Sequence, residues 1–271
     1  MKPYVKRNKN DANDAEGIRE AVTRPTMRFV AIKSAEQQSV LMMHRTRDLL
    51  VRQRTMLINA LRAHLAPGSS PGQALLGVVA PTGVPHVKKL LAVIDDDADD
   101  RVPAPARSCL QGMARQYLSL RREIVAGEKR IHAWHRANED SRRLETARGI
   151  GPLGASALTA SIADPAVFKS GRMMAAWIGL TPRQNSTGGK QRLGRITKQG
   201  DPYLRWLLVA GAMSVIRQAK IHGTTDPWLA ELIARKPTKV AAVALANKNA
   251  RIAWALLRYG GTYQKPATAA A

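Results

Sequence analysis

The chain has 271 residues, and 43 Lys and Arg against 20 Asp and Glu give it a formal net charge of +23. Its length allows one large domain or two smaller ones. The charge exceeds what solubility needs, so the expected partner is a polyanion, with nucleic acid the first candidate. The single cysteine, Cys109, excludes a disulfide framework and a cysteine-based zinc site, which indicates a reducing cytoplasm. Neither a membrane span nor secretion is expected, because no run of about 18 apolar residues and no signal-peptide core occurs.

A first long helix is predicted over residues 34–65. Ser34, followed three residues later by Gln37, has the pattern of a capping box. Apolar residues then recur at heptad and four-residue spacing, which is typical of a coiled-coil-like stripe: Met43, Leu50, Leu57, Leu61 and Leu65. PGSSPG at 67–72 ends this helix, and loop with a short helix is expected up to about Pro105. The acidic run DDDADD at 95–100 is interpreted as a solvated turn rather than a metal site.

A second long helix follows, and the two are expected to form an antiparallel hairpin. Its apolar residues alternate steps of three and four: Leu110, Met113, Tyr117, Leu120 and Ile124, continued by Ile131 and Trp134. His132 and His135 are expected to be solvated, because no acidic or cysteine ligand lies at metal spacing. The outer faces are expected to carry Arg45, Arg47, Arg52, Arg54, Arg121, Arg122, Lys129 and Arg130. Two roles remain open for these cations: solubility, or a basic track along the helices that binds nucleic acid.

From about Arg148 the pattern changes to shorter helices punctuated by glycine. Gly149 and Gly151 form a Gly-x-Gly turn before an Ala-rich helix, which resembles a helix-hairpin-helix element and predicts a phosphate contact, although ordinary helix capping also fits. Asp201-Pro202 and Asp226-Pro227 each predict a cap followed by a first-turn proline. A last helix is expected over about 238–259. Few strand patterns appear, so the predicted fold class is mainly α.

The stretch TPRQNSTGGKQRLGRITKQGD, residues 181–201, is the candidate functional segment. Its five cations are predicted to bind nucleic acid: Arg183, Lys190, Arg192, Arg195 and Lys198. Between Arg148 and Lys220 there are eleven Lys or Arg and only two acids, a bias that phosphate binding explains better than solubility does. Ser186 and Thr187 offer hydroxyl nucleophiles that would need such a charged surround to attack a phosphodiester. Simple turn composition is the alternative for these residues.

Two separated motifs carry a resemblance to a known family. The stretch GIGPLGASALTASIADPAVFKSGRMMAAWIGLTPRQNSTGGKQRLGRITKQGDPYLRWLL resembles the C-terminal domain of the bacterial insertion-sequence transposases of the one-ten class, relatives of the Piv invertases. NKNDANDAEGI, near the N-terminus, resembles the closing motif of that family's DEDD nuclease-like domain. Their order and spacing match through a helical linker, so the resemblance covers nearly the whole chain.

The resemblance implies a DNA recombinase. It implies a RuvC-like, RNase-H-type domain whose four acids hold a divalent metal such as Mg²⁺, a coiled-coil linker, and a C-terminal domain whose serine attacks double-stranded DNA at element ends and target. It also implies a structured guide RNA from the element, and a homo-oligomer in which the acids of one protomer and the serine of another form a composite site. The implied location is the bacterial cytoplasm, at the nucleoid.

The family's site residues carry over only in part. Its last two acids correspond to Asp11 and Asp14, three positions apart on one side of a helix. The first aspartate and the glutamate have no counterpart, because the chain begins just before the motif, and Glu16 and Glu20 are not assigned in their place. The nucleophile position, directly before Gly188, holds Thr187, with Ser186 as the fallback. Threonine keeps the hydroxyl, but its methyl group stiffens the rotamer and crowds an in-line attack.

These observations predict a division of the chain into segments and leave three hypotheses for its function. The division is a remnant of the nuclease-like domain at 1–33, a helical linker at 34–145, a C-terminal transposase domain at 146–262 and a tail at 263–271. The first function is a DNA transposase that cleaves and transfers strands. The alternative is an inactive, truncated transposase that only binds DNA or RNA. A generic RNA-binding or ribosome-associated protein is a third, weaker hypothesis.

Overall fold

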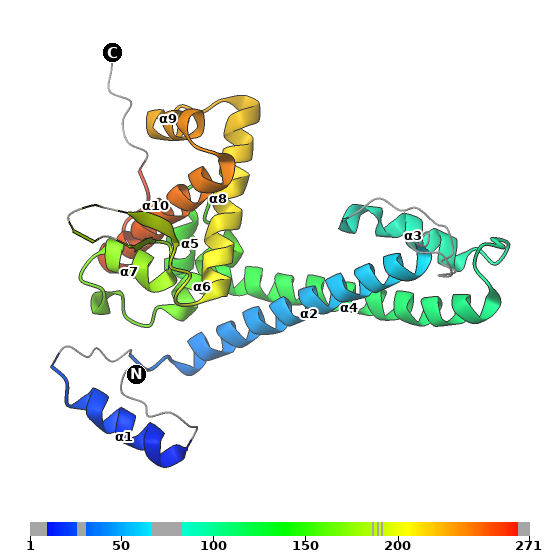
Figure 1. Ribbon diagram of the computed structural model, residues 1–271, viewed down its shortest axis with the longest axis horizontal. Coiled ribbons are helices and arrows are strands. Elements are labelled where there is room, and N and C mark those ends of the chain that lie inside the picture. Colours follow the sequence, from blue (N-terminus) through cyan, green and yellow to red (C-terminus); the bar gives the residue numbers. More distant parts are fainter. Residues whose placement is uncertain are drawn as a thin grey trace.

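A computed structural model of the chain describes residues 10–25, 31–66, 83–185, 187–188, 190 and 192–264. It is mainly helical, as predicted (Figure 1). The helices are α1 (Asp11–Val22), α2 (Ala35–Leu65), α3 (Val87–Asp95), α4 (Ala104–Ala137), α5 (Glu139–Glu145), α6 (Pro152–Ser161), α7 (Gly171–Ile178), α8 (Pro202–His222), α9 (Pro227–Arg235) and α10 (Thr238–Tyr259). Short 3-10 turns lie at η2 (Val84–His86) and η3 (Pro165–Val167), and the strands are β1 (Pro182–Gln184) and β2 (Leu193–Ile196).

The predicted helical hairpin is present: α2 and α4 run antiparallel over most of their length (Figure 1). The capping box is confirmed, because Ser34 Oγ accepts from the Gln37 amide and the Gln37 side chain accepts from the Ser34 amide. The helix ends at Leu65, as predicted. The sequence of PGSSPG lies outside the described residues, whereas the short helix expected after it is α3.

The buried residues of α2 differ in part from the predicted apolar stripe. Leu61 and Leu65 are fully buried, but Met43, Leu50 and Leu57 are only half-buried. The seam runs instead through other positions of the same helix, with Val40 and Ile58 buried and Arg47 paired with Glu128 of α4. The prediction that Arg47 lies on an outer face is wrong. Arg47 lies between the two helices, and its guanidinium donates to Glu128 Oε1 at 2.6 Å.

His135 is a second correction, because it is buried rather than solvated. Its side chain contacts Ser141 Oγ at 2.8 Å and Glu145 Oε2 at 2.8 Å, both on α5. Asn138, between α4 and α5, closes one helix and caps the next by accepting from the Ser141 amide. The sharp turn after α4 folds α5 back onto the histidine, a contact that heptad spacing on α4 alone does not reveal.

The far end of the hairpin has its own small core. Leu61, Leu65, Leu90 and Ile94 bring α2 and α3 together with the start of α4. Arg107 is buried beneath this cluster and donates to the carbonyl oxygens of Val93, Ile94, Asp99 and Val102 at 2.7 to 3.2 Å. The acidic run 95–100 forms the turn that was predicted, and within the described residues no cluster of three or more possible metal ligands occurs.

The main core lies in the C-terminal half. α6, α7, α8 and α10 surround a cluster built from Ala, Leu, Ile and Met, which is the composition expected of a chain with two Phe. Asp201 and Asp226 cap α8 and α9 as predicted, by accepting from backbone amides two or three residues ahead. α6 joins this core to the linker, because it packs against α2 and α4 as well as α8.

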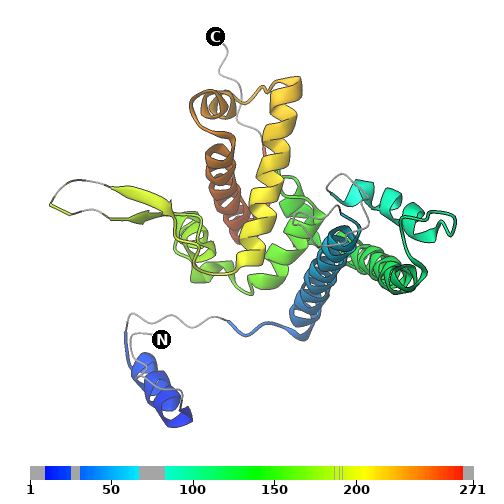
Figure 2. The same ribbon diagram turned by 45° about the vertical axis from the view of Figure 1, so that its right-hand side comes forward.

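α1 lies apart from the other helices in both views (Figures 1 and 2). It begins at Asp11, and Asn10 caps it by accepting from the Ala12 amide. Within the described parts of the chain, no helix is both long enough and apolar enough to cross a bilayer.

Candidate nucleic-acid interface

The basic segment forms a two-stranded antiparallel hairpin rather than an irregular loop. It projects from the helical body on its own (Figure 2). Pro182 pairs with Ile196 and Gln184 with Leu193, and an extra residue in β2 makes a bulge between these pairs. Every residue of the two strands is exposed except Ile196, at the end of β2, which is half-buried. Alternating polarity was absent from the sequence because neither face of this hairpin is buried, so the usual strand signal does not arise.

The base of the hairpin is fixed by the C-terminal core. Arg205 of α8 donates to the carbonyl oxygens of Ile178 at 2.8 Å and Gln199 at 2.9 Å, one on each side of the hairpin. Asn247 of α10 donates to Leu180 O at 3.2 Å. Gly200 lies so close to α7 that an added Cβ would stand 1.9 Å from Trp177 O. These contacts hold the orientation in which the hairpin leaves the domain.

The tip of the hairpin carries the predicted nucleophile. The Lys190 amide donates to Thr187 O at 3.1 Å, which closes a four-residue turn with Gly188 at φ +56°. Thr187 is exposed. Ser186, the fallback nucleophile, lies outside the described residues. The described part of the hairpin holds no carboxylate or imidazole, so a proton acceptor for the hydroxyl must come from elsewhere.

The five predicted cations are all exposed on or beside the strands. Arg183 is on β1, Arg195 on β2, and Lys190, Arg192 and Lys198 flank the strands. Arg183 makes one long contact to Thr197 O at 3.4 Å. Arg205, counted with this basic region in the sequence, has the structural role described above. Two other cations of α8, Arg217 and Lys220, are exposed, so the positive surface of this half of the chain includes α8 as well as the five hairpin cations.

The Gly-x-Gly turn, predicted to belong to a helix-hairpin-helix-like element, joins α5 to α6. Gly149 has φ +94°, and the Gly211 backbone of α8 lies so close that a Cβ on Gly211 would stand 2.0 Å from Gly149 O. Asn249 donates to Arg148 O at 3.1 Å. A Cβ added to Gly149 itself would stand 2.9 Å from Asn249 Nδ2, so its positive φ and its packing both favour glycine there. Gly151 differs, because it is the exposed N-cap of α6 and nothing lies within 4 Å of a Cβ placed there.

The two predicted metal ligands lie in the first turn of α1. Asp11 and Asp14 are both exposed and on one side of that helix. Among the described residues, no third acid, histidine or cysteine joins them to make a group that could hold an ion. Two carboxylates on one helix do not fit a complete divalent-metal site. α1 and the hairpin also lie apart in both views, so the structure does not bring these acids to Thr187 (Figures 1 and 2).

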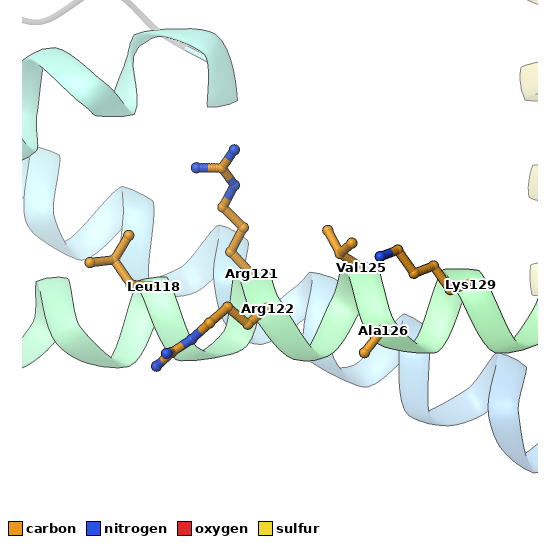
Figure 3. A pocket seen from close by; sticks show the side chains of 6 residues that line it. All are labelled: Leu118, Arg121, Arg122, Val125, Ala126 and Lys129. Atoms are coloured by element: carbon orange, nitrogen blue, oxygen red, sulfur yellow. The ribbon is translucent and has the colours of Figure 1, made fainter.

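A hollow of about 560 Å³ lies on α4, away from all these residues (Figure 3). It is lined by Leu118, Arg121, Arg122, Val125, Ala126 and Lys129. Its three cations are among those predicted on the outer faces of the linker. The hollow offers positive charge and apolar surface but no acid or hydroxyl, so it lacks the groups that strand cleavage requires.

Comparison with known proteins identifies the family. A model of the transposase IS116/IS110/IS902 family matches residues 141–228, and a DEDD-type transposase model matches residues 1–67. The putative transposase y4pF/y4sB of Sinorhizobium fredii is 45% identical over 97% of this chain and 66% of its own length. The probable family 20 transposase of Pseudomonas aeruginosa is 46% identical over 95% and 74%. The transposase for insertion sequence element IS1111A of Coxiella burnetii is 40% identical over 97% and 71%.

The chain belongs to the IS110/IS116/IS902 family of transposases. It spans about two thirds to three quarters of the length of these relatives. The family implies DNA as a partner and, through the DEDD match, dependence on a divalent metal. The match at 141–228 contains the turn, α6, α7 and the whole hairpin, so the exposed basic hairpin lies within the part of the chain that the family model recognises.

Proposed function

We propose that this transposase binds double-stranded DNA through its β1–β2 hairpin and cleaves and transfers strands through the hydroxyl of Thr187. The observation that carries the proposal is the hairpin itself. It is an exposed, rigidly based element with five cations and no acid, and it places a hydroxyl at its tip. An arm of this kind can reach a duplex without bringing the bulk of the domain against it.

The cations have separable roles. Arg183, Arg192 and Arg195 can each hold a phosphate with a planar fork, whereas Lys190 at the turn supplies a compact charge beside the hydroxyl. Lys198, near the base, extends the positive surface toward α8. The exposed N-terminus of α6 at Gly151 offers backbone amides to a further phosphate. Gly149 supports that turn by its packing rather than by contact with DNA.

The proposed reaction is a transesterification at phosphorus. The Thr187 oxygen forms a new bond to phosphorus as one bond between phosphorus and a deoxyribose oxygen breaks, which leaves a protein-linked phosphodiester. The hydroxyl proton passes to an acceptor outside the hairpin, and the departing deoxyribose oxygen is protonated. Transfer reverses these bonds with a hydroxyl of another strand. Arginine forks stabilise the negative charge that develops on the non-bridging oxygens.

Partners must complete this site. We assign to Asp11 and Asp14 a share in a Mg²⁺ site whose remaining ligands lie outside this pair. We also propose a homo-oligomer that brings the acids of one protomer to the hairpin of another. An element-encoded guide RNA, which the family resemblance implies, is the proposed source of target choice.

Trapping of a covalent adduct tests the nucleophile. The purified chain is incubated with Mg²⁺, element RNA and supercoiled donor DNA, and protein-linked DNA is measured after denaturation. We expect an adduct that Thr187→Ala abolishes and Thr187→Ser restores, since serine keeps the oxygen without the methyl group. Ser186→Ala is the matched control and should leave the adduct in place. Loss with Ser186→Ala alone would move the nucleophile by one residue, and no adduct with any chain would leave only a binding protein.

Binding to DNA tests the hairpin separately. The triple variant Arg183→Gln, Arg192→Gln, Arg195→Gln should weaken binding to all duplexes alike and reduce the salt dependence of affinity, because fewer counterions are released. Replacing Arg45, Arg122 and Arg130 of the linker by Gln removes the same charge elsewhere. Equal losses in both triple variants would indicate general electrostatic attraction and contradict a specific role for the hairpin.

A further inference from the structure

Trp177 lies where α7 meets the base of the basic hairpin. It is the second-last residue of α7, and its carbonyl oxygen lies against Gly200, where the hairpin segment returns to the core. The side chain is 36% exposed. Its indole contacts the ring of Phe168, with the ring centroids 5.5 Å apart at an interplanar angle of 56°. Because Phe168 packs on the main core, the core supports the indole while part of its surface stays open to solvent.

Three of the other four tryptophans of the chain already have a partner for their polar group or their ring. The indole N–H groups of Trp134 and Trp254 donate to oxygen atoms at 2.7 and 3.1 Å. A lysine ammonium lies 3.9 Å from the ring centroid of Trp228. The indole N–H of Trp177, in contrast, makes no hydrogen bond within the described part of the chain. Trp177 therefore offers both an open ring surface and a donor to a ligand.

The surface around Trp177 is basic. Residues 165–200 contain seven Lys or Arg and no Asp or Glu. Lys169, Arg172 and Met173 are exposed on α7 or directly before it, and Met173 lies on the same side of the helix as Trp177. A nucleotide has a flat base and a phosphate, and an aromatic ring flanked by cations matches both of its parts. An apolar protein segment would match the ring and the methionine but would leave these cations without partners.

Trp206 of α8 is more exposed, at 55%, but its surroundings differ. Arg205 is the only cation between residues 202 and 216, and its guanidinium is held by two carbonyl oxygens at the hairpin base. Trp206 also stacks on the ring of Tyr203 at an interplanar angle of 23°. Its own part of α8 therefore offers no further cation for a phosphate, which makes Trp206 a matched control for Trp177.

We propose that Trp177 stacks on one unpaired base of the DNA strand that the hairpin binds. The proposal rests on the function proposed above, because the hairpin supplies the phosphate contacts beside the ring. The bases of an intact duplex present only their edges in the grooves, so an indole reaches the face of a base only where pairing is lost. Since Trp177 lies at the base of the hairpin and Thr187 at its tip, the stacked base flanks the cleavage site.

Binding to three matched DNAs tests this site. Fluorescence anisotropy compares a fully paired duplex, a duplex with a short central bubble of unpaired bases, and a duplex whose bubble lacks the bases on both strands. The full chain should bind the bubble duplex about tenfold more tightly than the paired one, the order expected for stacking of one base on an aromatic ring. The abasic bubble allows the same bending of the DNA but has no base to stack, so it should lose this preference.

Substitutions assign the preference to the ring. Trp177→Leu keeps an apolar contact with Phe168 but has no aromatic face, so it should bind the paired and bubble duplexes alike, and Trp177→Phe should retain part of the preference. Trp206→Leu removes the more exposed indole and should behave like the wild type. A fluorescent base analogue in the bubble should be quenched by the wild type and by Trp206→Leu but not by Trp177→Leu. Circular dichroism establishes that each variant is folded.

Three results would overturn the proposal: equal binding of the paired and bubble duplexes by the wild type, a preference that persists with the abasic bubble, or a preference that persists in Trp177→Leu. The hairpin is tested separately by the variant Arg183→Gln, Arg192→Gln, Arg195→Gln, which should weaken binding to all three DNAs and keep the ratio between them. No effect of that variant would contradict the hairpin as the DNA-binding arm, whereas an unchanged ratio in Trp177→Leu contradicts only the stacking site.

Discussion

Replacement of Gly200 by alanine should displace the base of the hairpin. Two costs add at this position. Gly200 has φ +75°, and an alanine forced into the left-handed region costs about 1–2 kcal/mol. The new Cβ would also stand 1.9 Å from Trp177 O, a backbone atom of α7, so the chain must move by roughly 1.5 Å to restore ordinary contact. Overpacking of this kind costs about 1–3 kcal/mol, which gives a total of about 2–5 kcal/mol.

Gly188 provides a matched control in the same hairpin. Its φ is +56°, but nothing lies within 4 Å of an added Cβ, so Gly188→Ala carries the backbone cost alone. Urea unfolding followed by circular dichroism should show a loss of about 1 kcal/mol for Gly188→Ala and at least twice that for Gly200→Ala. DNA affinity should fall more for Gly200→Ala, because the arm leaves the domain at a different angle. Equal losses of stability in the two variants would refute the close approach of the hairpin base to α7.

Two further expectations concern buried polar groups. Burial, reinforced by the charge of Arg47, lowers the pKa of His44 to about 4. The folded chain therefore binds fewer protons than the unfolded chain between about pH 4 and 6.5. The free energy of unfolding should fall by about 3 kcal/mol as the pH drops through that window. His44→Gln should flatten this pH dependence in urea unfolding, and an unchanged slope would assign it to other groups. Arg107→Met should release four backbone carbonyl oxygens and raise amide exchange in residues 87–102 while leaving α8 and α10 protected; exchange that rises equally in α10 would mean that Arg107 supports the whole fold rather than the far end of the linker.

Helix boundaries were predictable wherever a local signal sets them. Ser34 with Gln37, Asp201 with Pro202, and Asp226 with Pro227 are self-contained capping patterns, and the structure confirms each. The hairpin strands were not predictable, because a hairpin exposed on both faces has no apolar alternation to reveal it. Its chemical character was predictable, since the bias toward cations does not depend on secondary structure.

Contacts between distant segments account for the remaining differences. The spacing of Met43, Leu50 and Leu57 correctly indicates a helix with an apolar side, but periodicity does not say which partner that side meets. The position of Arg205 between Ile178 O and Gln199 O likewise depends on how α8 crosses α7. A sequence shows that an arginine is present but not that two carbonyl oxygens will be brought to it. The assignment of Asp11 and Asp14 to a metal site rests on the motif alone and stays a prediction, and the structure adds no third ligand to this pair among the described residues.

The junction around His44 connects the linker to the hairpin. His44 of α2 contacts Ser156 Oγ of α6 at 3.0 Å and the Tyr203 hydroxyl of α8 at 3.1 Å. Because Ser156 Oγ donates to Pro152 O at 2.7 Å, the imidazole donates to Ser156 through Nε2 and accepts from Tyr203 through Nδ1, as a neutral ring can. Tyr203 lies two residues beyond Asp201, where the hairpin segment ends.

The position of the hairpin is therefore coupled to α2 through a buried, fully paired contact rather than a flexible joint. α2 thus has its seam with α4 on one side and this junction near its N-terminal end, so the same helix links the far end of the linker to the base of the basic arm. His44→Gln should therefore raise amide exchange in α6 and in the first turn of α8 while residues 87–102 stay protected. Exchange that rises equally in residues 87–102 would mean that the junction supports the whole linker rather than the position of the arm.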